Sequence, residues 1–209
     1  YTLLLCMKRT GFIAFVAGIV VYILVEYRSA PKGSKKRVFV LLGGLLALTA
    51  MYFFIMENTR GTFSVIDRLL STGQTSNEGR EDVWPVVISM IRHSDIIALI
   101  FGHGFDTVIE NSPLALSAHC DFLEVIYDYG VSGLLLYLTF YKRLWNGFIK
   151  MYRQGSELAA PMSFTFVTAF VVSLFSHLII FPTYFLGFCL FWGLAIGSVD
   201  SEEANSLRY

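Results

Sequence analysis

Three residues in this sequence have side chains suited to binding an anion and moving a proton. Arg80 directly precedes a predicted helix, where free backbone N–H groups and the helix dipole also favour an anion. His119 lies at the expected start of a second helix, a position that disfavours imidazolium and leaves the ring able to accept a proton. Arg9 follows Lys8 at the end of an apolar stretch, and a basic residue at membrane depth is a functional candidate by default.

Each of these residues also has a structural explanation. Lys8 and Arg9 can reach lipid headgroups along the membrane surface. Arg80 can pair in solvent with a neighbouring acid, and His119 can equally form a structural hydrogen bond. These alternatives stay open at the level of single residues.

The other three histidines carry weaker signals. His103 lies between two glycines, which indicates a turn, and His93 is expected in solvent. His177 lies within an apolar stretch, where it forms either a hydrogen bond between helices or a contact with a cavity. The three cysteines lack metal-ligand or paired spacing, so the sequence predicts no metal site. Signatures of nucleotide motors, serine hydrolases of the usual type and zinc proteases are also missing.

The composition predicts an all-α integral membrane protein. Of the 209 residues 55% are hydrophobic and only 15% charged, and the mean hydropathy is +0.60. Apolar stretches long enough to cross a bilayer alternate with short basic or polar segments. Because the chain opens inside an apolar run at Tyr1, we expect it to be the C-terminal part of a longer protein.

Five transmembrane helices are predicted, at residues 10–25, 38–56, 131–149, 159–178 and 182–197. Basic residues gather after the first and third spans, which places both connections in the cytoplasm. The predicted organisation is two transmembrane helices with a basic cytoplasmic loop (1–56), a large extracytoplasmic loop (57–130), three transmembrane helices (131–199) and a cytoplasmic tail (200–209).

The large outer loop is expected to be partly helical. Trp84, Val87, Ile88 and Ile91 recur at helical spacing and predict an amphipathic helix, and a second helix is predicted to begin near Ser117 and to run into the third span. Between them, 101–105 and 111–113 are expected to be turns. Residues 57–129 contain eleven acids and four arginines, which argues against binding of nucleic acid.

Several motifs together resemble the C-terminal half of the O-antigen ligase and Wzy-type polysaccharide polymerase family, over about Leu3 to Leu138. They occur in the family's order and spacing. The motifs are Lys8-Arg-Thr-Gly11, Gly79-Arg-Glu-Asp-Val-Trp84, Phe101-Gly-His-Gly-Phe105, His119-Cys-Asp-Phe-Leu-Glu124 and Tyr129-Gly-Val-Ser-Gly-Leu134.

The resemblance implies a membrane glycosyltransferase of GT-C-like architecture at the outer face of the bacterial inner membrane. A hydroxyl of an acceptor glycan would displace undecaprenyl diphosphate from a lipid-linked glycan donor, with no metal and no other cofactor. Matched residue by residue, His119 would assist deprotonation of the hydroxyl, and Arg9 and Arg80 would bind the diphosphate. Supporting roles are assigned to Lys8, Asp121, Glu124 and His103.

The subfamily stays open, because Lys8 and Cys120 depart from the family pattern. The leading hypothesis is a polymerase of O-antigen, capsule or exopolysaccharide repeat units. The alternatives are a ligase that transfers glycan to lipid A core, a transporter or flippase subunit lined by Lys8, Arg9 and His177, and a membrane scaffold. Expected partners are the lipid-linked donor, the glycan acceptor and membrane lipid, and a chain-length regulator and a flippase are further candidates.

Overall fold

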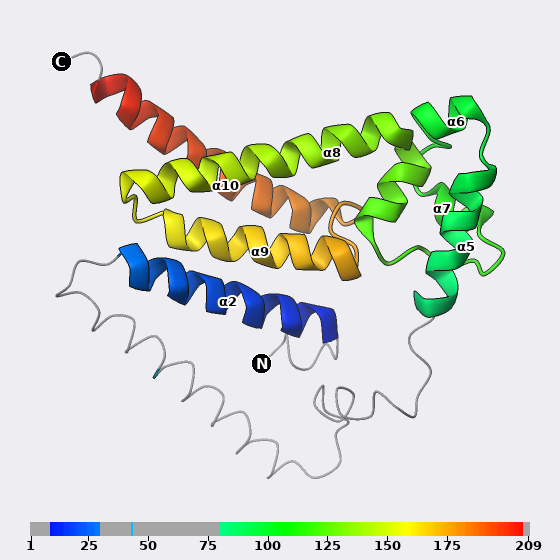
Figure 1. The fold of residues 1–209 in the computed structure, drawn as a ribbon, viewed down its shortest axis with the longest axis horizontal. Coiled ribbons are helices and arrows are strands. Elements are labelled where there is room, and N and C mark those ends of the chain that lie inside the picture. The colour runs from blue at the N-terminus through cyan, green and yellow to red at the C-terminus, as the bar shows by residue number, and fades with distance from the viewer. Residues whose placement is uncertain (1–8, 30–42, 44–79, 207–209) are drawn as a thin grey trace, which may run out of the picture. The chain divides into compact units, whose positions relative to one another are not determined.

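The computed structural model describes residues 9–29, 43 and 80–206, and this part of the chain is helical and contains no strand (Figure 1). The all-α prediction is therefore confirmed for these residues. Lys8, most of the predicted span 38–56 and the first part of the outer loop, 57–79, lie outside them. The chain divides into two compact units, one made of Tyr1–Gln74, Phe148–Thr168 and Ala195–Tyr209, the other of Thr75–Gly147 and Ala169–Leu194.

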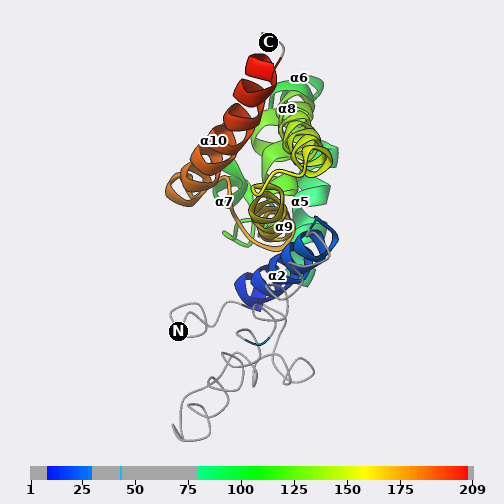
Figure 2. The ribbon, with the colours of Figure 1, turned by 90° about the vertical axis from the view of Figure 1, so that its left-hand side faces the viewer.

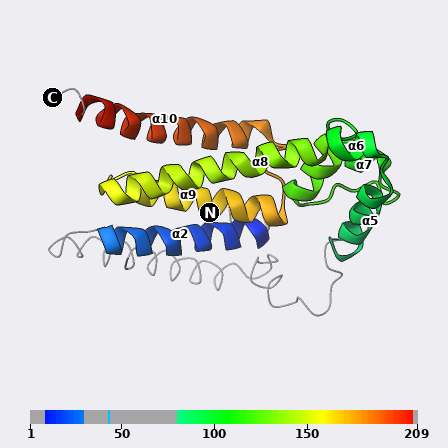
Figure 3. The ribbon, with the colours of Figure 1, turned by 45° about the horizontal axis from the view of Figure 1, so that its top comes forward.

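The second unit contains the candidate residues of the outer loop. It comprises α5 (Arg80–His93), α6 (Ile96–Phe101), α7 (Thr107–Asn111) and parts of α8 (Asp121–Gln154), α9 (Ala159–Phe175) and α10 (Pro182–Ser206). The short helices α5, α6 and α7 gather around the amino end of α8 (Figures 1 and 3). A small core holds them there, and it consists of Val83, Val87, Val108, Ala118 and Tyr127.

The predicted amphipathic helix exists as α5, but its buried face is turned by about one residue. Val83 and Val87 are fully buried, and Ile91 packs against the same core. Ile88, predicted on the apolar face, is 37% exposed. Trp84 is half-buried, and its indole N–H donates a hydrogen bond to the carbonyl of Ala118, in the turn before α8.

Two glycines allow two segments of backbone to cross closely in this unit. Gly102 ends α6 with φ of 85°, and Gly130 interrupts α8 with φ of 68°. A Cβ at Gly102 would overlap the backbone of Asp128, and a Cβ at Gly130 would overlap the backbone of Ile100. The predicted turn at 101–105 is confirmed, and the crossing explains in physical terms why glycine stands in both segments.

Helix α8 begins at Asp121, four residues after the predicted start at Ser117. The prediction was wrong because His119 has a positive φ of 51°, a conformation that an α-helix cannot contain. Beyond the kink at Gly130 the helix continues through the predicted span 131–149.

In the first unit, α2 (Arg9–Ser29) packs against the first part of α9. The buried Gly18 gives room for the side chains of Thr168 and Phe164, which a Cβ at this position would overlap. The Phe164 ring also meets the Phe15 ring edge-on at 5.8 Å between centroids. Helices therefore occupy the predicted span 10–25 and most of 159–178.

Helix α10 continues from Pro182 to Ser206, so it includes the predicted span 182–197 and part of the predicted tail (Figure 2). Among the described residues, its segment Pro182–Ser201 is the one helix both long and apolar enough to cross a membrane. Helix α9 is apolar but shorter, with 17 residues.

Candidate functional site

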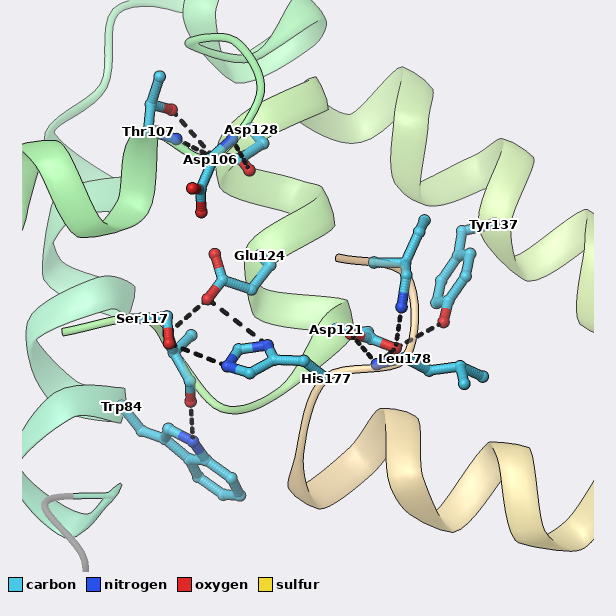
Figure 4. A network of polar contacts seen from close by, with 12 residues as sticks. Trp84, Asp106, Thr107, Ser117, Asp121, Glu124, Asp128, Tyr137, His177 and Leu178 are labelled. Atoms are coloured by element: carbon cyan, nitrogen blue, oxygen red, sulfur yellow. Dashed lines mark hydrogen bonds and ion pairs between the residues drawn. The ribbon is translucent and has the colours of Figure 1, made fainter. Parts of the chain in front are cut away.

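A short turn at residues 117–120 precedes α8 and is held on both sides (Figure 4). Trp84 of α5 donates its Nε1–H to the carbonyl of Ala118 at 2.8 Å. The N–H of Ala118 donates to Oε1 of Glu124 at 2.6 Å, much as a capping-box side chain reaches back from the first turn of its helix. Because Ala118 is fully buried, water cannot replace either contact, and the turn is fixed in place.

His119 follows this held residue and adopts the left-handed backbone conformation. His enters that region more readily than most residues, but the conformation still costs roughly 1 kcal/mol. The contacts of Ala118 on either side stabilise it. His119 is half-buried and lies two residues before the first residue of α8, so its ring is close to the helix N-terminus and remains reachable from solvent.

A second imidazole lies against His119. His177 follows α9, and its ring centroid is 4.8 Å from that of His119, with the ring planes tilted by 39°. Its Nε2 is 2.9 Å from Oγ of Ser117. Its Nδ1 is 3.9 Å from Oε1 of Glu124, which is an ion-pair distance rather than a hydrogen-bond distance. The loop after α9 therefore brings a histidine to the turn that precedes α8 (Figure 4).

Glu124 is 1% exposed, and the pKa of its carboxyl is far above the ordinary value. Burial first of all, and to a smaller extent the carboxylates of Asp128, Asp106 and Asp121, raise the pKa of its carboxyl to about 7, against the lowering effect of the hydrogen bond from Ala118. Its Oε2 is buried and has no hydrogen-bond partner among the described residues. A carboxyl in this state changes charge near neutral pH and can exchange a proton with a neighbour.

Asp121 fixes the loop that carries His177. Its carboxylate accepts the backbone N–H of Leu178 at 3.0 Å and that of Ile179 at 3.3 Å. It also accepts the hydroxyl of Tyr137 at 3.0 Å, and it is fully buried. Burial raises the pKa of Asp121, and these hydrogen bonds oppose the shift. Asp121 thus acts on the site through the backbone next to His177 (Figure 4).

Asp128 holds the other side of the second unit. Its carboxylate accepts the backbone N–H groups of Asp106 and Thr107, at 2.8 and 3.1 Å, and the Thr107 hydroxyl at 2.9 Å. The side chain of Asp106 does not cap α7, so the carboxylate of Asp128 accepts the free N–H groups at the start of that helix instead. Asp128 lies on α8, one helical turn after Glu124. Burial raises the pKa of Asp128, as it does for the other buried acids of α8.

The remaining predicted site residues are placed as follows. His103 stacks on Tyr127 at 4.2 Å between ring centroids, and its Nδ1 is 3.2 Å from the Tyr127 carbonyl oxygen, so it belongs to the backbone crossing. Arg80 is the first residue of α5, and Arg9 is the first residue of α2, in the other unit. Their side chains and Lys8 lie outside the described part of the structure, so their proposed anion binding stays a prediction.

The structure therefore brings together His119, Asp121 and Glu124 from the predicted set and adds three residues. His177, Ser117 and Trp84 were not assigned to this site from the sequence. A signal for His177 did exist, because the predicted topology put the end of the fourth span on the same side of the membrane as the outer loop. The structure shows that the two segments touch, through the contacts of His177 with Ser117 and His119 and through the N–H groups of Leu178 and Ile179, which donate to Asp121.

A groove of about 440 Å³ runs along the same part of α8. Its lining is mainly aromatic and aliphatic, with hydroxyl groups from Ser132 and two tyrosines. Tyr137 and Ile179 belong both to this lining and to the contacts of Asp121, so the groove adjoins the loop that carries His177.

This arrangement is suited to taking a proton from a bound hydroxyl. A reachable imidazole lies two residues before the first residue of α8. A second imidazole and a carboxyl that titrates near neutrality lie next to it. Among the described residues, no group of three or more His, Cys, Asp or Glu side chains is placed to hold a metal ion.

Comparison with known proteins gave one family match. The model of a family described as O-antigen ligase matches residues 1–138, which include the turn with His119 and the first part of α8. No curated protein and no solved structure matched the chain. Because the matched segment is well over half of the 209 residues, the chain belongs to the O-antigen ligase family.

Proposed function

We propose that this protein polymerises oligosaccharide repeat units carried on undecaprenyl diphosphate, at the outer face of the bacterial inner membrane. The family consists of inner-membrane enzymes of the O-antigen ligase or polymerase type, which act on lipid-linked glycans. The polymerase reaction, the undecaprenyl carrier and the membrane topology belong to the proposal. The product is an O-antigen, a capsule or an exopolysaccharide.

In the proposed reaction, a hydroxyl oxygen of the acceptor glycan attacks the anomeric carbon of the donor sugar. The bond between that carbon and the diphosphate oxygen breaks, and undecaprenyl diphosphate leaves with the electron pair. His119 takes the proton of the hydroxyl. The guanidinium groups of Arg9 and Arg80 stabilise the charge that grows on the leaving diphosphate, so they favour the transition state over the ground state.

The geometry around His119 is the observation that supports this proposal best. A strained backbone conformation persists only where its surroundings impose it, and such conformations cluster at functional sites. Here Trp84 and Glu124 hold the neighbouring residue from both sides. The held turn presents an imidazole at the start of α8, as a general base requires.

The topology in this proposal keeps five transmembrane helices, with residues 57–130 outside and 200–209 in the cytoplasm. The apolar helix at Pro182–Ser201 supports the last span. The shorter apolar helix Ala159–Phe175 supports the fourth span, which ends just before His177. This path puts His177 and the turn with His119 on the same side of the membrane, in agreement with their contact.

A ligase that moves glycan onto lipid A core is the second candidate, and the description of the matched family favours it. Both reactions use the same donor, base and leaving group, so the acceptor alone separates them. A scaffold or a transporter does not require a strained histidine beside a buried acid.

Purified full-length protein supplied with lipid-linked repeat units tests the proposal. The expected result is a ladder of longer lipid-linked chains on a gel, which His119→Asn abolishes and His93→Asn leaves intact. His93 is a suitable control because it is exposed and bonds to Ser89 within α5. Transfer that occurs only after lipid A core is added would replace the polymerase with the ligase, and a protein inactive with either acceptor would refute both.

A further inference from the structure

The pairing of His177 with Glu124 next to His119 is not explained by a single general base. The His177 ring lies 4.8 Å from the His119 ring between centroids, and its Nδ1 lies 3.9 Å from Oε1 of Glu124. Its side chain is 9% exposed, and that of Glu124 is 2% exposed. Two titratable groups with almost no access to water therefore stand behind the half-buried base.

The position of His177 is imposed by several contacts. Ser117 Oγ lies 2.9 Å from its Nε2, and the carboxylate of Asp121 binds the backbone N–H groups of the next two residues, Leu178 and Ile179. The Phe181 ring also meets the His177 ring edge-on, at 6.5 Å between centroids. These contacts fix the orientation of the His177 ring more tightly than chance proximity of the loop after α9 to the turn at 117–120 would.

The charge on Glu124 affects the stability of protonated His119. When His119 takes a proton from the acceptor hydroxyl, its ring becomes positively charged, and the centroid of that ring is 4.8 Å from the centroid of the His177 ring. A carboxylate on Glu124, which lies 3.9 Å from the neighbouring His177, stabilises that charge in a site where burial weakens screening. The buried Oε2 of Glu124 and its raised pKa of about 7 fit a group that shares a proton with these rings.

We propose that His177 and Glu124 form a positioning pair that sets the basicity of His119 and stabilises its protonated form during glycan transfer. The inference rests on the proposed function, since it gives the pair a role in the same reaction. Neither residue needs to touch the sugar or the diphosphate. Glu124 acts through His177, and His177 acts through His119.

Among the described side chains, the titratable groups known to act on Glu124 are acidic, and a thiol lies in the same turn. From α8 come Asp121 and Asp128, and from the start of α7 comes Asp106, all of which disfavour a second negative charge on Glu124. Cys120 lies in the same turn, and burial raises the pKa of its thiol, so it stays neutral. Helix α5 begins with Arg80, Glu81 and Asp82, the charged residues of its first turn.

The test is the pH profile of elongation by the full-length protein, with the rate measured at saturating and at limiting donor concentration from pH 5.5 to 8.5. Glu124→Gln removes the charge and keeps an oxygen for the N–H of Ala118. His177→Gln removes the titrating ring and keeps a polar group near Ser117. Glu110→Gln removes one exposed carboxylate of α7 and is the matched control.

The expected sign follows from the charge. Without the carboxylate, protonated His119 is less stable, so its pKa falls. The acidic limb of the profile then moves to lower pH by about one unit, the size expected for one charge at this separation in a partly buried site. The value of kcat falls roughly tenfold, because a weaker base transfers the proton less efficiently, while KM changes little. His177→Gln changes the profile in the same direction, and Glu110→Gln leaves it unchanged.

The outcomes separate this inference from the proposed function. A wild-type pH profile in both Glu124→Gln and His177→Gln, at normal protein yield and thermal stability, would overturn the pair while His119→Asn is still inactive. If His119→Asn elongates chains at the normal rate, the proposed base itself is wrong, and the pair falls with it. A rise in KM alone would also refute the inference, because it would show a role in binding.

Discussion

The backbone of His119 restricts which residues can stand at that position. Only Gly, Asn, Asp and His reach its positive φ at low cost, so larger or β-branched side chains strain the turn whatever their chemistry. A loss of activity after replacement by Ala or Gln therefore mixes strain with loss of the imidazole. Asn is the substitution that separates the two, because it tolerates the backbone and has no basic group.

Replacement of His119 by Asn should leave the fold intact and remove the general base. We expect the elongation rate to fall by roughly 10²- to 10⁴-fold, the usual contribution of a positioned base. The free energy of unfolding should stay within about 1 kcal/mol of the wild type, because Asn accepts the left-handed conformation. Thermal unfolding in detergent, measured beside the elongation assay, checks both. An unfolded variant would contradict the stability part.

The raised pKa of Glu124 makes the stability of the protein depend on pH. This carboxyl titrates near pH 7 in the folded chain and near 4.5 in the unfolded chain, so the folded chain binds the proton more tightly. Its contribution to stability is fully present below pH 4.5 and is lost as the pH rises through 7. Between pH 5 and 8 the wild type should lose about 2 kcal/mol relative to Glu124→Gln.

Thermal unfolding at several pH values tests this prediction. The melting temperature of the wild type should fall more steeply between pH 5 and 8 than that of Glu124→Gln. Parallel curves for the two proteins would show that Glu124 has an ordinary pKa in the folded chain. Glu110→Gln again controls for the loss of one exposed charge.

At the scale of elements, the crossing of α6 over α8 determines where the turn with His119 can lie. Gly102 and Gly130 lie at the crossing, and Asp128 stands next to it with its carboxylate on the start of α7. The kink at Gly130 separates the part of α8 that belongs to the outer loop from the part predicted to enter the membrane. A straight helix would not allow this crossing.

Gly130→Ala and Gly155→Ala together test the crossing. Both glycines have a positive φ, 68° at Gly130 and 67° at Gly155, and Gly130 also has a ψ of −169°, a combination that glycine alone adopts readily. A Cβ at Gly155 meets nothing within 4 Å, so this change should cost only about 1 kcal/mol. A Cβ at Gly130 also collides with backbone that cannot yield, so the cost should exceed about 3 kcal/mol. Equal losses of melting temperature would argue against the crossing.

The elements that follow from local chemistry were predictable from the sequence. Helical spacing predicted α5, and the glycines around His103 predicted the turn after α6. The buried face of α5 was misplaced because Val83 is small and its burial depends on a core formed with Val108 and Tyr127, far along the chain. The start of α8 was misplaced because the conformation of His119 is imposed by contacts and not by propensity.

At the scale of the whole molecule, charge bias predicts the orientation of the helices, and labelling with a membrane-impermeant thiol reagent tests it. In a cysteine-free background, Leu114→Cys should react from the outside of spheroplasts, because Leu114 is 42% exposed in the predicted outer loop. Gln154→Cys, exposed at the carboxyl end of α8, should react only after the membrane is permeabilised. Reaction of both from the same side would contradict the five-span path.

The sequence singled out His119, Asp121 and Glu124 for the site but not His177, for a physical reason. His119 stands inside a recognisable local motif, whereas His177 stands in an apolar stretch with no motif of its own. Their contact is supported by hydrogen bonds that the backbone N–H groups of Leu178 and Ile179 donate to Asp121, across 57 and 58 residues of sequence. A pairing across that distance depends on the packing of α8 and α9 and leaves no periodic signal in the sequence.

The hydrogen bonds that Asp121 accepts from Leu178 and Ile179 also have a consequence for biosynthesis. The ribosome makes the turn with His119 well before it makes Leu178 and Ile179, so the nascent chain carries the base without its neighbouring imidazole. The buried carboxylate of Asp121 lacks its backbone donors until α9 and the following loop have been made. A chain that stops before residue 177 would keep every residue of the matched segment 1–138 and still lack a finished site.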